Sequence, residues 1–420
     1  MSNKRKIIND PVFGFISVPN DLVYDVLSHP YVQRLNRIRQ LGLSFLVYPG
    51  AQHSRFSHSI GAMHLMHEAI AALRLKGVDI TTTEETAAMI AILLHDIGHG
   101  PFSHVLEHTL VHGVSHEDIS LLMMERIKAD LENTPAAVDP EGGRPLEMAI
   151  AIFRNEYPKH FLHQLISSQL DVDRMDYLCR DSFFTGVQEG RVASERLLKM
   201  LDVHDGRLVV QVKGIYSVEK FLIARRLMYW QVYLHKTSVA AEQHLIRILE
   251  RAQMLAHTPG GADLFCSPAL RYFLYNRIAF DNFAVRSGAL DMYALLDDND
   301  VLCAIKAWIA CGDKVLSLLC RSFIDRRLFR GELLDEPLSE ERKQELNLLY
   351  AHALGVSTQE GAAFWSEHVS TSNTYSEKDD SIEILYADGS VRDVADASEI
   401  LDLEALTRKP TKRYLFKYRI

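Results

Sequence analysis

The sequence predicts a mainly α-helical protein with short β-hairpins and a small α+β appendage at its C-terminal end. Apolar residues recur at intervals of three and four over most of the chain, as they do on one face of a helix. Short segments in which apolar and polar residues alternate around turn-forming residues predict the hairpins. The composition changes after about residue 355, where polar residues dominate. We therefore expect a helical core over residues 1–355 and an appendage over residues 356–420.

A hairpin and two helices are expected before residue 100. The stretch "KIINDPVFGFISVP" alternates apolar residues around an Asp, a Pro and a Gly, which predicts a hairpin. Residues 54–76 have the apolar spacing of an amphipathic helix. The next helix begins in "TTTEET", where threonine caps precede glutamates in the first turn, and it ends at the glycines and proline of residues 98–101.

The rest of the core is expected to be helical, with one more hairpin. The expected helices cover residues 116–132, 145–180 and 217–256. Between the last two, "MLDVHDGRLVVQVKG" predicts a hairpin that turns at Asp205 and Gly206. In the appendage, "IEILYADGSVRDV" predicts a hairpin with an Asp-Gly turn, and "KRYLFKYRI" predicts a final strand.

Composition restricts the class of protein. An apolar fraction of 47% and a charged fraction of 24% are typical of a globular protein. No window of about 18 uninterrupted apolar residues occurs and the start lacks the apolar run of a signal peptide, so we expect a cytoplasmic protein without a membrane partner. The five cysteines form no C-x-x-C pair, which argues against a disulfide framework and a thiolate zinc site.

The net charge of −9 argues against broad, non-specific binding of nucleic acid. Only the basic residues of the final strand, Arg413, Lys417 and Arg419, favour such a partner, and a strand paired within the appendage explains them as well. Nucleic acid is therefore a weakly supported partner.

Histidines are concentrated in one part of the chain. Ten of the nineteen fall between His53 and His116, and imidazole is the commonest metal ligand in proteins. In "AAMIAILLHDIGHGPFSH", His95 and Asp96 come at the end of an apolar helix, where both side chains can converge on one ion such as Mg, Mn, Fe or Zn. The alternative is that this pair only caps or salt-bridges the helix end.

Further ligands would have to come from other helices. His58 is a plausible ligand near the start of the helix at residues 54–76, because His64 and His67 point away from it. Asp173, Tyr177 and Asp181 recur every four residues and, with Arg180 beside them, form a polar stripe on an apolar helix. Such a stripe is often a solvated face, but this mixture of side chains favours a site. The spacing of four among His104, His108, His112 and His116 selects none of them, because Gly113 makes an unbroken helix doubtful.

Ordered motifs from about residue 9 to residue 236 resemble the HD-domain phosphohydrolase superfamily. They are "NDPVFGFI", "VQRLNRIRQLG", "YPGAQHSRFSHSIGA", "HDIGHGPFSH", "SHED", "LDVDRMDYLCRD" and "YLHK". Within the superfamily, the chain is most similar to the deoxynucleoside triphosphate triphosphohydrolases. The resemblance implies an HD-domain helical core, a nucleotide substrate and a homo-oligomer, either a dimer or a tetramer.

The resemblance also implies roles for individual residues. One divalent metal ion, which could be Mn, Fe, Ni, Zn or Mg, would be bound by His58, His95, Asp96 and Asp173. The catalytic groups would be His99, His116 and Glu107, although the family usually has aspartate where Glu107 stands. The substrate would be contacted by Arg55, His104, Gln40, Leu41, Arg174, Tyr177, Asp181 and Tyr233.

The implied activity is hydrolysis of a deoxynucleoside triphosphate at the α-phosphorus, which yields a nucleoside and triphosphate. An acidic protein binds a triphosphate only by concentrating cations locally; besides the metal these would be Arg55, Arg174, Arg225 and Lys236. Two alternatives stay open at this point. One is an HD phosphohydrolase that acts on another phosphate ester, as a 5'-nucleotidase or a phosphodiesterase. The other is a regulatory protein that binds nucleotide or nucleic acid.

Overall fold

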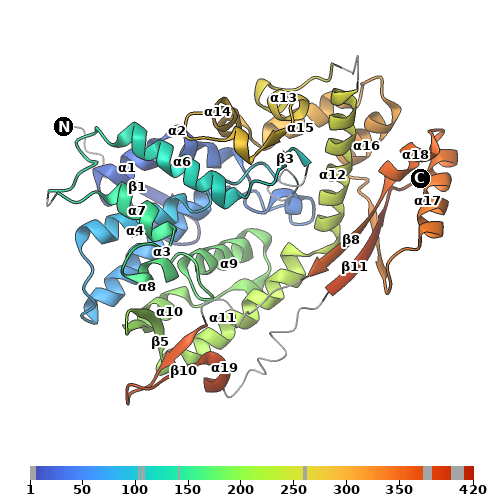
Figure 1. Cartoon of the computed structure of the whole chain (residues 1–420). Helices are drawn as coiled ribbons and strands as arrows, with labels where there is room; N and C mark the ends of the chain where they lie inside the picture. The colour runs from blue at the N-terminus through green and yellow to red at the C-terminus, as the bar shows by residue number, and fades with distance from the viewer. Residues whose placement is uncertain are drawn as a thin grey trace.

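Three helices form the centre of the protein. The computed structural model describes residues 6–102, 105, 109–140, 142–258, 263–371, 381–398 and 411–420. Helix α3 (Arg55–Leu75) packs against α4 (Thr82–Leu94) on one side and α9 (Val172–Thr185) on the other. In Figure 1 these helices lie together in the blue-to-green part of the chain. The mainly α-helical fold predicted from the sequence is confirmed.

Helix α4 is buried along almost its whole length, which explains its uninterrupted apolar sequence. Its first turn is fixed by a capping box in which Thr81 and Glu84 bond each other's backbone N–H groups. Its last residue is Leu94, so His95 and Asp96 follow directly where the chain leaves the helix. Two metal-ligating residue types are thereby placed deep in the protein at a helix end.

The other helices pack against this centre or, like α16 to α18, lie beyond α12 (Figure 1). They are α1 (Asp21–Ser28), α2 (Pro30–Arg34), α6 (His116–Leu131), α7 (Pro145–Phe153), α8 (His160–Gln164), α10 (Ser194–Met200), α11 (Ile215–Met228), α12 (Lys236–His257), α13 (Pro268–Tyr275), α14 (Gly288–Leu295), α15 (Asp298–Trp308), α16 (Lys314–Ile324), α17 (Glu340–Leu354), α18 (Thr358–Gly361) and α19 (Val394–Ala397). Short 3-10 segments include Leu35–Arg37 and Gly42–Leu46. No helix among the described residues is both long and apolar enough to cross a membrane.

The helix predicted over residues 145–180 is wrong, because the chain forms three separate helices there: α7, α8 and α9. Helix α7 ends before Asn155, whose φ of 59° is incompatible with a continuing right-handed helix. Helix α9 has its own N-cap, because the Asp171 side chain accepts a bond from the backbone of Arg174. Since α9 starts independently, Asp173 lies in its first turn.

The helix predicted over residues 217–256 is also interrupted. Helix α11 continues into a π-helical turn (Tyr229–Tyr233), and α12 begins anew after His235, which caps it. A π-helical turn often marks a functional site. This one directs Tyr233 toward α9, where its hydroxyl bonds Asp181. Periodicity alone did not reveal the break, because apolar spacing persists across it.

The predicted hairpins and the final strand are confirmed. Strand β1 (Ile7–Asp10) pairs antiparallel with β2 (Gly14–Ser17), and β4 (Leu201–His204) with β5 (Arg207–Gln211). Asp205 and Gly206 both have positive φ, as a two-residue hairpin turn requires. In the C-terminal part, β9 (Glu383–Leu385) pairs with β10 (Val391–Asp393), and β11 (Thr411–Lys417) is the last strand.

Strands from both sides of residue 355 share two sheets. Strand β11 lies between β7 (Arg330–Leu334) and β8 (Trp365–Thr371), while β9 pairs parallel with β5. A two-stranded parallel pair joins β3 (Val111–His112) to β6 (Ile278–Ala279). Figure 1 shows β8 and β11 beside α12, and β10 beside the lower end of α11. The domain boundary at residue 355 stays a prediction.

Candidate active site

The predicted metal ligands meet where α3, α4 and α9 come together. His58 lies in the first turn of α3, His95 and Asp96 follow α4, and Asp173 lies in the first turn of α9. Oδ1 of Asp173 is 3.1 Å from Nε2 of His58 and 3.3 Å from Nε2 of His95. One ligand atom from each of these three residues lies within 4.8 Å of the other two. Asp96 Oδ1 is 3.4 Å from Nε2 of His95.

The hydrogen bonds of both histidines leave the correct nitrogen for a metal ion. Nδ1 of His58 donates to Oδ2 of Asp176 at 2.7 Å, and Nδ1 of His95 donates to the carbonyl of Ile92 at 2.7 Å. Both Nε2 atoms are buried and have no hydrogen-bond partner among the described residues. A histidine ligand usually donates its other N–H in this way, which fixes its tautomer. His95 therefore caps the helix end with one nitrogen and turns the other toward the cluster.

The electrostatics of the cluster favour a bound cation. Burial lowers the pKa of His58, but the nearby carboxylates of Asp173 and Asp176 outweigh burial and raise the pKa to about 10. Burial raises the pKa of Asp173, but the charge of His95 and the bond from His58 lower it below the usual range. Carboxylates that stay ionised at such a buried position attract a divalent ion. Neutral imidazoles and carboxylates fit Mg, Mn, Fe, Ni or Zn, so the residues fit the predicted metal.

A buried ion network that the sequence analysis missed supports His58 from behind. Asp176 accepts the bond from His58 and pairs with Arg180, whose Nη2 is 2.9 Å from Oδ1 of Asp176. Nη1 of Arg180 reaches Oδ2 of Asp10, at the end of β1, at 2.7 Å. The side chains of Asp176 and Arg180 are fully buried. The sequence analysis placed Arg180 beside the polar stripe, but its side chain is buried in the ion network, while Asp173, Tyr177 and Asp181 share another face.

Gly61 makes room for this network. A Cβ atom at Gly61 would overlap Oδ1 of Asp176 and Nη2 of Arg180. We expect Gly61→Ala to lower the free energy of unfolding by about 1–3 kcal/mol, because overpacking displaces the buried pair. Urea unfolding monitored by circular dichroism measures this change. Gly288→Ala is the matched control, since a Cβ there meets open space; equal stability losses in both variants would contradict the explanation.

The predicted phosphate-handling residues lie on one side of the metal ligands. Nη1 of Arg55 is 2.5 Å from Oδ2 of Asp96, and Nε2 of His99 is 3.3 Å from Oδ1 of Asp96. The rings of His99 and His116 stack with centroids 3.9 Å apart. Burial first, and then the charge of Arg55, lowers the pKa of His99 to about 3. His99 is therefore neutral near pH 7 in the protein without substrate.

A cavity of about 560 Å³ opens on this side. Its lining includes the metal ligands His95, Asp96 and Asp173, together with His116, Arg154 and Arg174. Arg174 also pairs with Asp171, and its side chain is 23% exposed, so its guanidinium can reach a ligand in the cavity. Three further acidic side chains, Glu117, Asp118 and Glu156, also line it, so a polyanion would bind there at the arginines and at a metal ion.

A second cavity, of about 380 Å³, lies on the other side of the Arg55–Asp96 pair. All the predicted sugar-pocket residues line it: Gln40, Leu41, Tyr177, Asp181 and Tyr233, with Arg55. Oδ2 of Asp181 accepts a bond from the Tyr233 hydroxyl at 2.8 Å. Cavities of about 300 Å³ or more are large enough to bind small molecules. This one is large enough for a nucleoside.

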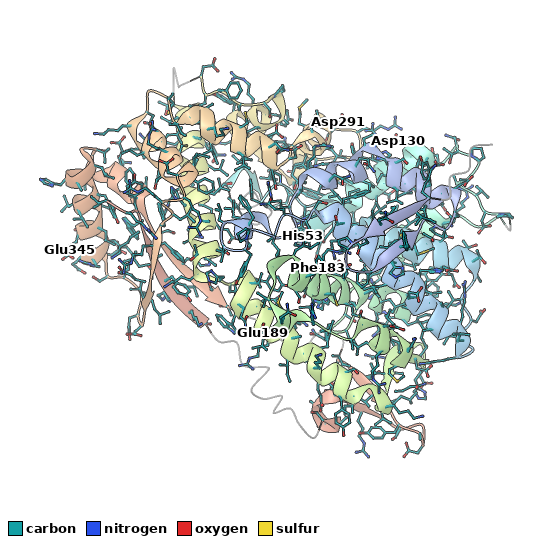
Figure 2. All side chains as sticks on the ribbon, turned by 180° about the vertical axis from the view of Figure 1, so that it is seen from behind. His53, Asp130, Phe183, Glu189, Asp291 and Glu345 are labelled. Carbon is teal, nitrogen blue, oxygen red and sulfur yellow. The ribbon has the colours of Figure 1, made fainter. Side chains whose placement is uncertain are left out.

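His53 is a residue of this site that the sequence analysis did not assign. Its Nε2 is 2.8 Å from Oδ1 of Asp181, and its ring stacks on Phe184 at 4.5 Å. Figure 2 shows the labelled His53 near the centre of the molecule beside α9. Asp181 is thus fixed from both oxygens, by His53 and Tyr233. Its position within the histidine-rich segment was the only available signal in the sequence.

Several predicted residues are not brought to the site or are not described. Lys236 lines another cavity, of about 850 Å³, together with Arg326, Arg330 and Lys417, and its phosphate contact stays a prediction. Arg225 is buried and donates to Gln169 at 3.0 Å. Glu107 and His104 lie outside the described residues, and their roles stay predictions. The four-residue histidine repeat does not form one helix, because β3 and Gly113, with a φ of 70°, interrupt it before His116 begins α6.

Comparison with known proteins agrees with this geometry. Residues 55–181 match the HD domain family, and residues 192–259 match the HD associated region. The uncharacterized protein YwfO of Bacillus subtilis is 34% identical over 330 residues, which are 78% of this chain and 72% of that protein. The crystal structure of a phosphohydrolase from Bacteroides thetaiotaomicron is 53% identical, with a TM-score of 0.93, and the match covers 99% of this chain and all of that one.

A relative with a named activity is more distant. The deoxynucleoside triphosphate triphosphohydrolase SAMHD1 homolog of Dictyostelium discoideum is 32% identical over 250 residues. These residues are 56% of this chain and 47% of that protein, so the chain spans less than half of that relative's length.

Proposed function

The chain belongs to the HD-domain superfamily of metal-dependent phosphohydrolases, and from this premise we propose that it hydrolyses deoxynucleoside triphosphates at the α-phosphorus. The products would be a nucleoside and inorganic triphosphate. The observation that supports this most strongly is the Arg55–Asp96 pair, which joins two different cavities. Asp96 lines one cavity with other metal ligands and two arginines, and Arg55 lines the other, which is the size of a nucleoside.

Helix α9 aligns the two cavities. Asp173 and Arg174 line the cavity that holds the metal ligands, whereas Tyr177 and Asp181 line the smaller one. Steps of four residues advance about 6 Å along a helix, which is similar to the distance from a phosphate to the sugar that carries it. A nucleoside triphosphate that follows α9 would have its phosphates beside Asp173 and Arg174 and its sugar beside Tyr177 and Asp181. Its α-phosphorus would then lie at the Arg55–Asp96 pair, beside the metal ligands.

Each group near the Arg55–Asp96 pair would have a role in the reaction. A divalent ion bound by His58, His95, Asp96 and Asp173 would polarise a phosphoryl oxygen and acidify a water molecule. Arg55 and Arg174 would bind the phosphate oxygens, because guanidinium groups match phosphate geometry with two parallel hydrogen bonds. Tyr177, Asp181 and Tyr233 would orient the sugar so that its 5' oxygen is the leaving group.

The stacked rings of His99 and His116 would deliver the proton that the departing 5' oxygen needs. In the protein without substrate, burial and Arg55 keep His99 neutral by lowering its pKa to about 3. Bound phosphates would partly neutralise Arg55 and so favour the protonated ring. A catalytic role for Glu107, which lies outside the described residues, stays a prediction.

Product analysis tests this proposal. The purified protein, loaded with one divalent metal at a time, is incubated with each deoxynucleoside triphosphate, and the products are separated by anion-exchange chromatography. We expect a nucleoside and triphosphate in equal amounts. Pyrophosphate with a monophosphate, or single phosphates, would reject cleavage at the 5' oxygen, and hydrolysis of a monophosphate or a phosphodiester alone would favour the alternative phosphohydrolase activities.

We also propose that the protein forms a homo-oligomer, either a dimer or a tetramer, and that it is cytoplasmic. Light scattering after gel filtration, with and without the four nucleotides, measures the first of these directly.

A further inference from the structure

The turn that follows α4 carries residues with two different roles. His95 and Asp96 are proposed metal ligands, and His99 stacks on His116 with ring centroids 3.9 Å apart. His116 is the first residue of α6, so the two stacked rings come from different segments of the chain. The backbone of residues 95–99 must therefore be held against α6 if the stack is to keep its place beside the metal ligands.

Ser120 of α6 bonds to both ends of this turn. Its hydroxyl donates to the carbonyl oxygen of His95 at 3.0 Å and accepts a bond from the backbone N–H of Gly98 at 2.9 Å. A serine hydroxyl has one donor and two acceptor positions, so it can make both bonds at once. Because Ser120 is fully buried, water does not compete for these bonds.

Gly98 brings the backbone of the turn into direct contact with α6. A Cβ atom at this position would overlap the carbonyl oxygen of His116 and the backbone nitrogen of Ser120. The φ angle of Gly98 is not in the left-handed region, so glycine is required here for space and not for its backbone conformation. His116 and Ser120 are four residues apart and lie on one side of α6, so this side of the helix holds both the stacked ring and the hydroxyl.

Two more buried side chains bond to the turn from other helices. The hydroxyl of Tyr293 on α14 donates to the carbonyl oxygen of Gly98 at 2.9 Å, and Nη1 of Arg34 on α2 donates to that of Ile97 at 3.3 Å. Neither of these residues belongs to α6. Of the three side chains, only Ser120 therefore connects the turn to α6.

We propose that Ser120 is a positioning residue, which fixes the stacked pair of His99 and His116 relative to the metal ligands. This inference rests on the proposed function, because it assumes that the pair delivers the proton to the leaving oxygen. The competing explanation is that Ser120 only satisfies two buried backbone groups at the end of α4 and so stabilises the fold. Both explanations predict a loss of stability when the hydroxyl is removed, but only the first predicts a specific loss of turnover.

The first test is Ser120→Ala, which removes both bonds and adds no atom. We expect the maximal rate of a single turnover to fall by about tenfold or more, because a small misplacement of a proton donor strongly slows the chemical step. The nucleotide concentration that gives half of this rate should change less than about threefold, since Ser120 lines neither cavity. Elemental analysis should show full metal content, because Ser120 bonds only to backbone groups of the turn.

Ser322→Ala is the matched control. Ser322 is also a buried helical serine, and its hydroxyl donates to the carbonyl oxygen of Arg327 at 2.5 Å, outside the site. This variant should unfold at a lower urea concentration than the unsubstituted protein, as Ser120→Ala should, but its turnover rate should be unchanged. Equal rate losses in the two variants, or an unchanged rate in Ser120→Ala, would overturn the inference.

A measurement that needs no turnover separates failure of this inference from failure of the proposed function. Stacked rings shield each other's carbon-bound protons, so NMR spectra of histidine-labelled protein report the stack, with its signals assigned in His99→Gln and His116→Gln. We expect both signals to lose this shielding in Ser120→Ala and to keep it in Ser322→Ala. If no triphosphate is hydrolysed but the signals change in this way, the proposed reaction is wrong and the positioning role stands. If triphosphate is hydrolysed and Ser120→Ala changes neither the signals nor the rate, the reaction stands and the positioning role is wrong.

Discussion

Replacing either His95 or Asp173 with alanine is expected to remove the bound metal ion and, with it, the hydrolytic activity. Nε2 of His95 and Oδ1 of Asp173 are 3.3 Å apart, although the two residues come from different parts of the chain. Each substitution therefore removes one ligand of the same site. Loss of one of the four proposed ligands leaves too few donors for tight binding. Elemental analysis of the purified variants should show less than about a tenth of the metal that the unsubstituted protein contains.

A histidine outside the cluster provides the matched control. His67 lies on α3, as His58 does, but it is exposed and pairs with Glu85. His67→Ala should therefore keep the full metal content. Full metal occupancy in both His95→Ala and Asp173→Ala would reject the ligand assignment, even if both variants had lost activity.

Replacing Arg180 with alanine is expected to lower the free energy of unfolding by about 3–5 kcal/mol, although Arg180 touches neither the metal ligands' coordinating atoms nor the cavities. The reason is that Asp10 and Asp176 would be left buried without their cation. The pKa of Asp176 is lowered, against burial, by Arg180 and His58, which indicates how much its charge depends on these partners. Denaturant unfolding in the presence of chelator measures the loss without a contribution from bound metal.

An exposed ion pair provides the comparison for this variant. Arg342 pairs with Glu345 at 2.6 Å on α17, and Figure 2 shows the labelled Glu345 at the outer edge of the molecule. Arg342→Ala should change stability by less than about 1 kcal/mol, because water screens and replaces such pairs. Arg180→Lys should give an intermediate loss, since it keeps the charge but not the guanidinium geometry. Equal losses of stability in Arg180→Ala and Arg342→Ala would show that the buried network stabilises the protein no more than an exposed ion pair does.

The sequence predicted the residues that combine a special side chain with a special place in a helix. His95 and Asp96 were recognisable because they end an apolar helix, and Asp173, Tyr177 and Asp181 because their spacing of four puts them on one face. The spacing could not distinguish His58 from its neighbours by itself; the resemblance to a family did so. The structure then brought all of these side chains into one region.

The residues that were missed act through contacts that are distant in the chain. His53 bonds Asp181 across 128 positions, and Asp10 bonds Arg180 across 170. No periodicity links such partners. Two of the predicted helices were too long for a related reason. The breaks at Asn155 and at the π-helical turn depend on local backbone conformation, while the apolar spacing continues across them. Among the missed residues, Asp176 was the easiest to predict, because it lies four residues before Arg180 on α9.

Isotope labelling of a single turnover tests the central claim most directly. The metal-loaded protein hydrolyses one deoxynucleoside triphosphate in water enriched in ¹⁸O, and mass spectrometry locates the label in the products. Attack of water on the α-phosphorus with departure of the 5' oxygen, as the position of the Arg55–Asp96 pair between the two cavities leads us to expect, would place one ¹⁸O atom in the triphosphate and none in the nucleoside. Label in the 5' hydroxyl of the nucleoside, or in a nucleoside monophosphate formed with pyrophosphate, would contradict it.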